Sequence, residues 1–361
     1  MNRILLTLCL PALTLLAAPP APAGEDAPQS ERVHAFYYTW YRNPDTDGHW
    51  SHWNHNVLLK DGSGTAFTPP EDIGANFYPA AGLYSSMNPN DTRRHMEEMK
   101  RAGVGVAAVT WWGTDHPTNK ALPVVFEAAR ETGMKVCFHL EPFPGRGAAT
   151  TRQALTYLHE HYGAHPALFR HKGRPLVYVY DSYLTPPGEW ASIFTKTGAD
   201  TIRDTPLDCV AVGLWVKEKD GEALRRGGFD GAYTYFATDG FTHGSTVENW
   251  PGMARWLAEK GMIFIPSAGP GYDDTRIRPW NGENRRDREK GAYYDRMFAA
   301  ALAVNPEIVS VTSYNEWHEG TQIEPAAPRQ SPGFTYADHQ GLPPEWYLDR
   351  TRHWAGQLKA R

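Results

Sequence analysis

The sequence predicts a single (β/α)8 barrel with long loops. Eight short apolar runs recur along the 361 residues, and stretches with helical spacing separate them. Polar and aromatic residues gather where the apolar runs end. Strict alternation of strand and helix favours a parallel sheet, and eight units allow that sheet to close. An open doubly wound sheet is the alternative, but the Gly-rich phosphate-binding fingerprint often found after the first strand of such folds is absent from the sequence.

The expected strands follow these apolar runs. They cover 33–40, 104–112, 135–141, 175–181, 209–216, 231–236, 262–267 and 308–314. Several are nearly continuous in Val, Ile, Leu or Ala, as in a barrel whose strands are covered on both faces. The expected helices cover 91–102, 120–132, 149–161, 188–203, 221–226, 247–260, 287–304 and 347–359. Asn90 or Asp91 is the expected N-cap of the first of them.

The N-terminal residues have the pattern of a secretory signal peptide. Arg3 precedes an apolar run at 4–16, and the small-residue exit Ala21-Pro22-Ala23 follows. The run is too short to span a bilayer, which argues against the alternative of a membrane anchor. We therefore expect a signal peptide at 1–23, a polar lead-in at 24–32, one domain over 33–361, and a secreted or periplasmic protein with no later membrane span.

Composition narrows the classes of partner. The net charge is −5 and acidic residues are mixed with basic ones, which argues against a nucleic-acid partner. Cys137 and Cys209 lie in strand-like runs and are expected as buried small side chains rather than a disulfide framework. The 13 Trp and 18 Tyr often stand beside His, Asn, Asp or Glu, a combination that suits sugars, although core packing explains most of them. We expect a monomer.

The ends of the expected strands carry the candidate site residues. In a (β/α)8 barrel, active residues come from the C-terminal ends of the strands. The aromatic and acidic residues at five of these ends are Tyr38, Tyr41, Trp112, Glu141, Tyr180 and Tyr235. Polar groups crowded on an apolar barrel cost folding free energy, so their presence favours a functional site.

Two glutamates follow the eighth apolar run, in the segment Ser-Tyr-Asn-Glu-Trp-His-Glu-Gly at 313–320. Cleavage of a glycoside requires one carboxyl group to protonate the departing oxygen and a second group to assist at the sugar, so Glu316 and Glu319 are the candidate catalytic pair. Side chains three residues apart on a straight strand point to opposite faces, about 10 Å apart, so the chain must turn directly after Glu316. Trp317 and His318 are then expected to wall the site and raise a carboxyl pKa. The alternative is a pair of surface or ion-paired acids.

Other candidates lie in three further segments. Glu141 is a third acid, expected either to accept a bond from a sugar hydroxyl or to form a buried pair with an arginine. The loop at 43–55 holds three histidines and two aspartates, but its spacing matches no standard zinc or calcium loop. We therefore predict no metal and no other cofactor. The loop histidines are expected either to bind sugar hydroxyls or to hold the loop itself, and His52 is assigned to the substrate. Trp280 and Asn281, after the seventh strand, are also assigned to substrate binding.

Five dispersed motifs resemble glycoside hydrolase family 99, the endo-α-1,2-mannosidases and endo-α-1,2-mannanases. They are Tyr-Tyr-Thr-Trp-Tyr at 37–41 with Asn-Pro at 43–44 and Asp-Gly at 47–48, His-Trp-Asn-His at 52–55, Thr-Trp-Trp at 110–112, His-Leu-Glu-Pro at 139–142, and Asn-Glu-Trp-His-Glu-Gly-Thr-Gln-Ile-Glu at 315–324. The resemblance runs from about residue 33 to 354. It implies a (β/α)8 barrel that cleaves within α-mannosyl chains, retains the anomeric configuration and uses no metal.

The resemblance also implies an unusual route, in which the 2-hydroxyl of the sugar attacks its own anomeric carbon and forms a 1,2-anhydro sugar. Glu316 would be the base for that hydroxyl, and Glu319 the acid for the leaving group and later the base for water. Tyr38, Trp112, Glu141, Tyr180 and Tyr235 would line the subsites.

Trp112 is similar to the residue of bacterial mannanase-like members that favour a mannosyl unit in the outermost subsite, where animal members have tyrosine and favour glucosyl. This similarity implies α-mannan or mannose-rich oligosaccharides as substrates. Arg42 departs from the family pattern, which has glycine there, and is expected to narrow or recharge the entrance.

Two readings from other classes compete. The first is a carbohydrate-binding protein on a degenerate barrel, and the presence of both acids counts against it. The second is a barrel domain that serves polysaccharide synthesis, for which an export signal is a poor fit.

Overall fold

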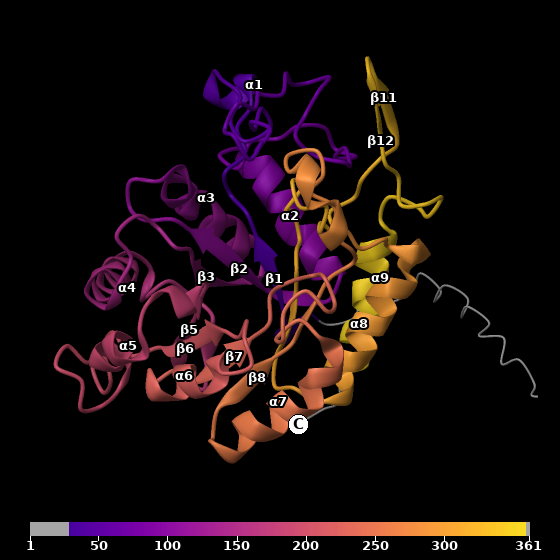
Figure 1. Ribbon diagram of the computed structural model, residues 1–361. Coiled ribbons are helices and arrows are strands. Elements are labelled where there is room, and N and C mark those ends of the chain that lie inside the picture. Colours follow the sequence, from indigo (N-terminus) through magenta and orange to yellow (C-terminus); the bar gives the residue numbers. More distant parts are fainter. Residues whose placement is uncertain (1–28, 359–361) are drawn as a thin grey trace, which may run out of the picture.

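The computed structural model describes residues 29–358, so the expected signal peptide lies outside the described residues. Nine parallel segments form the central sheet (Figure 1): β1 (Ser30–Tyr37), β2 (Val104–Trp111), β3 (Lys135–Leu140), β5 (Arg174–Val179), β6 (Val210–Leu214), β7 (Gly231–Tyr233), β8 (Ile263–Ile265), β9 (Ser267–Ala268) and β10 (Val309–Val311). Their order is β8-β7-β6-β5-β3-β2-β1-β10-β9.

One chain segment closes the barrel. β8 pairs with β7, and β9 pairs with β10, while only Pro266 separates β8 from β9. Proline has no N–H to give to a ladder, so the expected strand at 262–267 is divided at that residue. The carbonyl of Pro266 still accepts a bond from Ser310 N at 3.0 Å. The predicted (β/α)8 barrel is thus confirmed, with β8 and β9 sharing one of its eight positions.

Helices surround the strands on the outside (Figure 1). They are α2 (Pro89–Arg101), α3 (Pro117–Thr132), α4 (Ala148–Tyr162), α5 (Pro187–Phe194), α6 (Asp220–Arg226), α7 (Trp250–Glu259), α8 (Ala292–Ala303) and α9 (Trp346–Ala355). Outside the barrel pattern lie the short α1 (Pro44–Asp47), the small β4 (Arg170–His171) and a hairpin of β11 (Arg329–Ser331) and β12 (Phe334–Tyr336). Within residues 29–358 no helix is long and apolar enough to cross a membrane.

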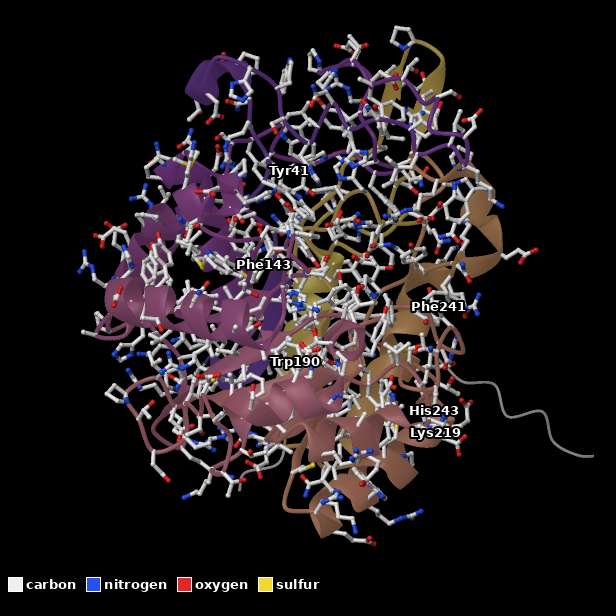
Figure 2. The ribbon with its side chains drawn as sticks, turned by 60° about the vertical axis from the view of Figure 1, so that its left-hand side comes forward. Tyr41, Phe143, Trp190, Lys219, Phe241 and His243 are labelled. Atoms are coloured by element: carbon white, nitrogen blue, oxygen red, sulfur yellow. The ribbon has the colours of Figure 1, made fainter. Side chains whose placement is uncertain are left out.

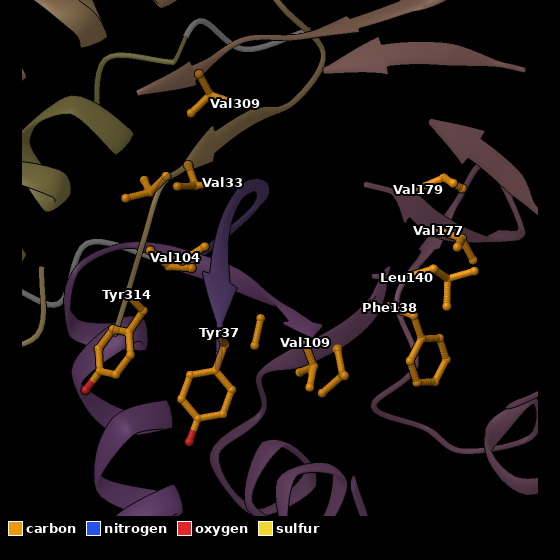
Figure 3. Close-up of a cluster of buried hydrophobic side chains, with 14 of the residues drawn as sticks. Val33, Tyr37, Val104, Val109, Phe138, Leu140, Val177, Val179, Val309 and Tyr314 are labelled. Carbon is orange, nitrogen blue, oxygen red and sulfur yellow. The ribbon is translucent and has the colours of Figure 1, made fainter. Parts of the chain in front are cut away.

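Side chains alternate between two buried layers along the strands. Tyr37, Val109 and Val177 belong to the layer packed with the helices (Figure 3). His34 and Tyr178 lie buried within the other layer, where the Tyr178 hydroxyl is 2.8 Å from His34 Nδ1. His139 Nε2 is likewise 2.8 Å from the Tyr233 hydroxyl. Aromatic rings and hydrogen-bonded polar groups therefore fill the barrel interior.

Two expected helix boundaries are wrong. The helix expected at 188–203 ends at Phe194, because Thr195 is extended, and Arg203 then holds the following loop through the carbonyl oxygens of Phe194, Cys209 and Gly228. The N-cap of α2 is Asn88, whose side chain accepts from Asn90 N, and Pro89 occupies the first turn.

The start of the first strand and the state of the two cysteines can also be compared with the sequence-based expectations. The first strand starts at Ser30, inside the expected lead-in, and Ser30 N donates to Gly103 O at 3.0 Å. Cys137 and Cys209 are free and buried, as expected.

Candidate active site

A cavity of about 410 Å³ opens among the loops that follow β1, β2, β9 and β10. Its wall carries both candidate acids and a group of aromatic and imidazole rings. The lining residues are Trp40, Ser51, His52, His55, Trp112, His116, Pro117, Ile277, Arg278, Glu316, His318 and Glu319.

The loop after β10 brings Glu316 and Glu319 to this cavity. Ser313 N donates to Thr321 O at 2.9 Å and Thr321 N donates to Glu316 O at 3.3 Å, so the outgoing and returning arms of the loop are joined. The expected turn therefore exists, although β10 ends at Val311 rather than at 314. The two carboxyl groups lie at the end of a narrow loop and face one cavity instead of opposite sides of a strand.

Buried side chains hold this loop against the first strand. Asn315 Oδ1 accepts from Tyr38 N at 2.7 Å, and Asn315 Nδ2 donates to Tyr38 O at 2.9 Å, so the amide continues the pairing of β1 past the end of β10. The Tyr41 hydroxyl donates to Asn315 O at 2.9 Å, and Tyr41 lies in the interior beneath the indigo loops (Figure 2). Trp317 is fully buried and donates to Glu324 Oε2 at 2.9 Å. Tyr41 and Trp317 thus support the loop and contribute no surface to the cavity.

Burial dominates the electrostatics of the two acids. Glu316 is 4% exposed, and burial raises its pKa, although His318 N donates to its Oε1 at 3.1 Å and favours the ionised form. The side chain of Glu319 is 25% exposed, and burial followed by the charge of Glu316 raises its pKa. Arg278 Nη1 lies 3.8 Å from Glu319 Oε1 and opposes both increases. The cavity can therefore keep one carboxyl protonated near neutral pH.

Imidazole rings form one side of the cavity. The ring centre of His318 lies 4.6 Å from that of His52 and 5.1 Å from that of His55. Burial lowers the pKa of all three, that of His318 to about 3. A neutral imidazole offers one donor and one acceptor, which suits sugar hydroxyls better than anions. Within residues 29–358 no group of three or more His, Cys, Asp or Glu side chains is placed to hold a metal ion.

The remaining tyrosines and Glu141 form a second group at the ends of the strands. The hydroxyls of Tyr38 and Tyr235 are hydrogen-bonded, and the ring of Tyr180 is 4.8 Å from that of Tyr235. Burial and then the charge of Glu319 raise the pKa of Tyr180. Glu141 Oε1 accepts from Thr110 Oγ1 at 2.7 Å and lies 3.2 Å from His139 Nδ1. Within residues 29–358 no arginine forms an ion pair with Glu141, and His139 and Thr110 take the place of the expected arginine partner.

Two tryptophans supply the flat faces of the cavity. Trp40 stacks on His52 with ring centres 4.0 Å apart, and Trp112 follows directly after β2. Within residues 29–358 neither indole N–H, both of them buried, has a hydrogen-bond acceptor.

Two assigned residues and Arg42 lie apart from the cavity wall. Trp280 is 48% exposed and donates to Leu58 O at 2.8 Å, while Asn281 donates to Asp274 Oδ2 at 2.9 Å. Arg42 is buried, lies 3.7 Å from Asp47 and donates to Pro117 O at 2.9 Å. It joins the first loop to the second rather than narrowing the entrance, and its charge adds to the lowering of the pKa of His52, which is mainly due to burial.

Sequence reasoning missed seven residues of the cavity wall. They are Trp40, Ser51, His55, His116, Pro117, Ile277 and Arg278. Trp40 and His55 belong to motifs already recognised, so proximity in the chain to Tyr41 and His52 was the available signal. Arg278 had a weaker signal, since it lies two residues before Trp280 in an irregular loop.

Comparison with known proteins gives a consistent result. The family model for glycosyl hydrolase family 99 matches residues 28–360. The chain is 43% identical to the glycoprotein endo-alpha-1,2-mannosidase of Xenopus laevis, over 92% of this chain and 78% of that protein. It is also 43% identical to the Rattus norvegicus enzyme of that name, over 90% and 74% of the two chains. The solved structure of the GH99 endo-alpha-mannosidase from Bacteroides thetaiotaomicron superposes with a TM-score of 0.89 at 44% identity, covering 91% of this chain and 98% of that one.

Proposed function

This chain belongs to glycosyl hydrolase family 99, the endo-α-1,2-mannosidase family, and from that premise we propose that it is a retaining enzyme that cleaves internal α-1,2-mannosidic bonds of α-mannan or mannose-rich glycans. One observation carries the proposal. Glu316 and Glu319 face one cavity from a single loop, and burial raises the pKa of both. Such a pair can divide the roles of base and acid at one glycosidic bond.

In the first step of the proposed reaction, ionised Glu316 removes the proton of the 2-hydroxyl. The 2-oxygen attacks the anomeric carbon and forms a 1,2-anhydro sugar. The bond to the departing sugar oxygen breaks, and that oxygen takes the proton of Glu319. Hydrogen bonding from His318 N to Glu316 favours the ionised base, and burial of Glu319 favours the protonated acid.

In the second step, Glu319 is ionised and removes a proton from water. The water oxygen attacks the anomeric carbon, the bond from that carbon to the 2-oxygen breaks, and Glu316 returns its proton to the 2-oxygen. Each step inverts the anomeric carbon, so the α configuration is retained overall. No carboxylate bonds to the sugar, unlike in the usual retaining route.

Substrate class and location are parts of the same proposal. The faces of Trp40 and Trp112 and the neutral imidazoles of His52 and His55 suit a mannosyl unit with its C–H faces and hydroxyls. The segment at 1–23 supports export to the periplasm or medium. The enzyme is proposed to act as a monomer without a cofactor.

Digestion of yeast α-mannan by the purified protein tests this function. We expect short manno-oligosaccharides by mass spectrometry, and NMR of the first products should show the α anomer at the newly formed reducing end. Release of free mannose alone would indicate an exo-acting enzyme, and an initial β anomer would indicate inversion. Either result would contradict the proposal. Fractionation of cells producing the full chain tests export.

Replacement of Arg278 by Gln should shift the pH–rate profile of kcat towards higher pH. The Arg278 guanidinium stabilises ionised Glu316 and Glu319, so its removal raises both pKa values further. Glu316 must lose a proton on the acid limb of the profile, and Glu319 must keep one on the alkaline limb. Both limbs therefore move to higher pH. Arg296→Gln, which removes an exposed partner of Glu289, is the control and should leave the profile unchanged. Limbs that stay in place or move downward would contradict the role of Arg278.

A further inference from the structure

A buried arginine, Arg288, contacts the loop at 312–324 that carries Glu316 and Glu319, called the catalytic loop below. Arg288 belongs to the segment between the loop after β9 and helix α8, and only 4% of it is exposed. It does not line the cavity that holds Glu316 and Glu319. Within residues 29–358 it forms no ion pair with an Asp or Glu side chain. A buried guanidinium without such a partner costs several kcal/mol of folding free energy, so its contacts require an explanation.

These contacts are directed at the return arm of the catalytic loop. Arg288 Nη2 donates to Gly320 O at 3.0 Å and to Gln322 O at 2.8 Å. The residue between them, Thr321, uses its carbonyl in the opposite direction, towards Ser313 N at 2.9 Å. Successive carbonyls alternate in direction here as they do along a strand. Arg288 thus supplies the donors that a neighbouring strand would supply, while the outgoing arm supplies those on the other edge.

The guanidinium is itself fixed in place. Its central carbon lies 4.6 Å from the ring centre of Phe77 and 4.5 Å from that of Tyr347, and both rings are buried. The planar guanidinium of arginine stacks on aromatic faces and donates within its plane, whereas the ammonium of lysine can lie over a ring but has no plane that fixes the direction of its donors. The two rings therefore restrict the plane in which Arg288 donates to the loop.

A second contact limits the freedom of the loop at the same point. Asp273 N donates to Glu319 O at 2.8 Å, and Gly320 has a φ of 61°, with its backbone so close to Asp273 that an added Cβ would lie 2.9 Å from Asp273 O. The backbone on both sides of Gly320 is consequently bonded to the segment between β9 and α8. The carbonyl of Glu319 accepts from Asp273 N, and the carbonyls of Gly320 and Gln322 accept from Arg288.

We propose that Arg288 is a positioning residue of this enzyme, which holds the return arm of the catalytic loop so that Glu319 meets the glycosidic oxygen. This role rests on the proposed function of Glu319. It is geometric, because Arg288 donates to main-chain carbonyls of the loop and not to either carboxyl group. A displacement of about 1 Å in a catalytic group can cost on the order of 100-fold in rate.

The test is Arg288→Met, which fills the space between the rings but cannot donate. We expect kcat to fall by about 10-fold to 100-fold with KM changed by less than about threefold, since the walls formed by Trp40, Trp112 and His52 come from other loops. The pH–rate limbs should stay in place, unlike those of the Arg278 variant. Arg288→Lys keeps the charge and should lose a similar factor in kcat. A wild-type kcat in the lysine variant would show that charge, rather than geometry, matters.

Arg203→Met is the control for loss of a ring-stacked arginine. Arg203 stacks on Phe194 and donates to three loop carbonyls before β6 and β7, at the end of the barrel opposite the site, and unlike Arg288 it also pairs with Asp208 and Asp230. Both methionine variants should lose thermal stability, and only the Arg288 variant should lose kcat per folded molecule. Equal kcat losses in the two variants, or no loss in Arg288→Met, would overturn the proposal. If Arg288→Met does not fold, kcat of Arg288→Lys tests the proposal in its place.

A readout without catalysis separates this proposal from the proposed function. Thr321 N and Ile323 N are hydrogen-bonded within the loop, and peptides covering 319–323 should exchange amide hydrogens faster in Arg288→Met than in the wild type or in Arg203→Met. A wild-type protein inactive on α-mannosides would contradict the proposed function alone. Unchanged exchange at 319–323 would contradict the positioning role alone.

Discussion

Glu319→Gln should lower kcat on an α-1,2-linked manno-oligosaccharide by roughly 1,000-fold, the range expected for loss of a general acid. The amide keeps the size of the side chain but cannot protonate the departing sugar oxygen. A substrate whose aryl leaving group departs as a stable anion needs no such proton, so the loss of rate in the bond-breaking step should be much smaller. Single-turnover rates with the two substrates measure this difference.

The second role of Glu319 gives an additional check. Azide has no proton to remove, so it should replace water as the nucleophile and restore turnover of the aryl substrate by the Glu319 variant. Glu283→Gln, an exposed glutamate of the neighbouring loop, is the control and should keep the wild-type rate. An equal loss of rate for good and poor leaving groups would show that Glu319 is not the acid.

Glu316→Gln should lower kcat at least as much, and to the same extent for every leaving group. Its predicted task is to remove the proton of the 2-hydroxyl, and no property of the leaving group replaces that step. The wild-type enzyme should accordingly fail to cleave a substrate analogue that lacks the 2-hydroxyl but still binds. Rates for both substrates and an inhibition constant for the analogue provide the measurement.

A sugar bound covalently to the protein would contradict the assignment of Glu316 as a base. A 2-deoxy-2-fluoro substrate has no 2-hydroxyl to attack its own anomeric carbon, so it should leave the protein mass unchanged. A stable mass increase located at Glu316 would identify that residue as a direct nucleophile. The usual two-carboxylate route would then replace the 1,2-anhydro route.

The barrel could be predicted because its strands depend on local sequence. Val104–Trp111 is buried at every position, and such a run has few alternatives to a covered parallel strand. The helix predicted at 188–203 is wrong beyond Phe194, because Trp190, Ile193 and Phe194 begin a helical pattern that Ile202 continues in the sequence. Arg203 instead contacts Gly228 and Asp230, 25 and 27 residues away, and no local pattern records those contacts.

The convergence of Glu316 and Glu319 on one cavity could be predicted, but the orientation of their neighbours could not. Glu316 and Glu319 were found from residue type and position, and the structure places both in the cavity. Trp317 stands between them in the sequence, yet it turns to the interior, where Glu324 accepts its indole N–H. Arg288 was equally hidden, because its significance depends on two carbonyl oxygens more than thirty residues away.

The filled interior of the barrel limits how reagents reach the anomeric carbon. With His34, His139, Tyr178 and Tyr233 packed below the acids, the side of the loops is the approach left open. The released glycan fragment and the incoming water must then share one passage. The fragment therefore has to leave before water can reach the anomeric carbon. An alcohol that enters before water would be glycosylated instead. The ratio of transglycosylation to hydrolysis would therefore measure the time between release of the glycan fragment and attack by water.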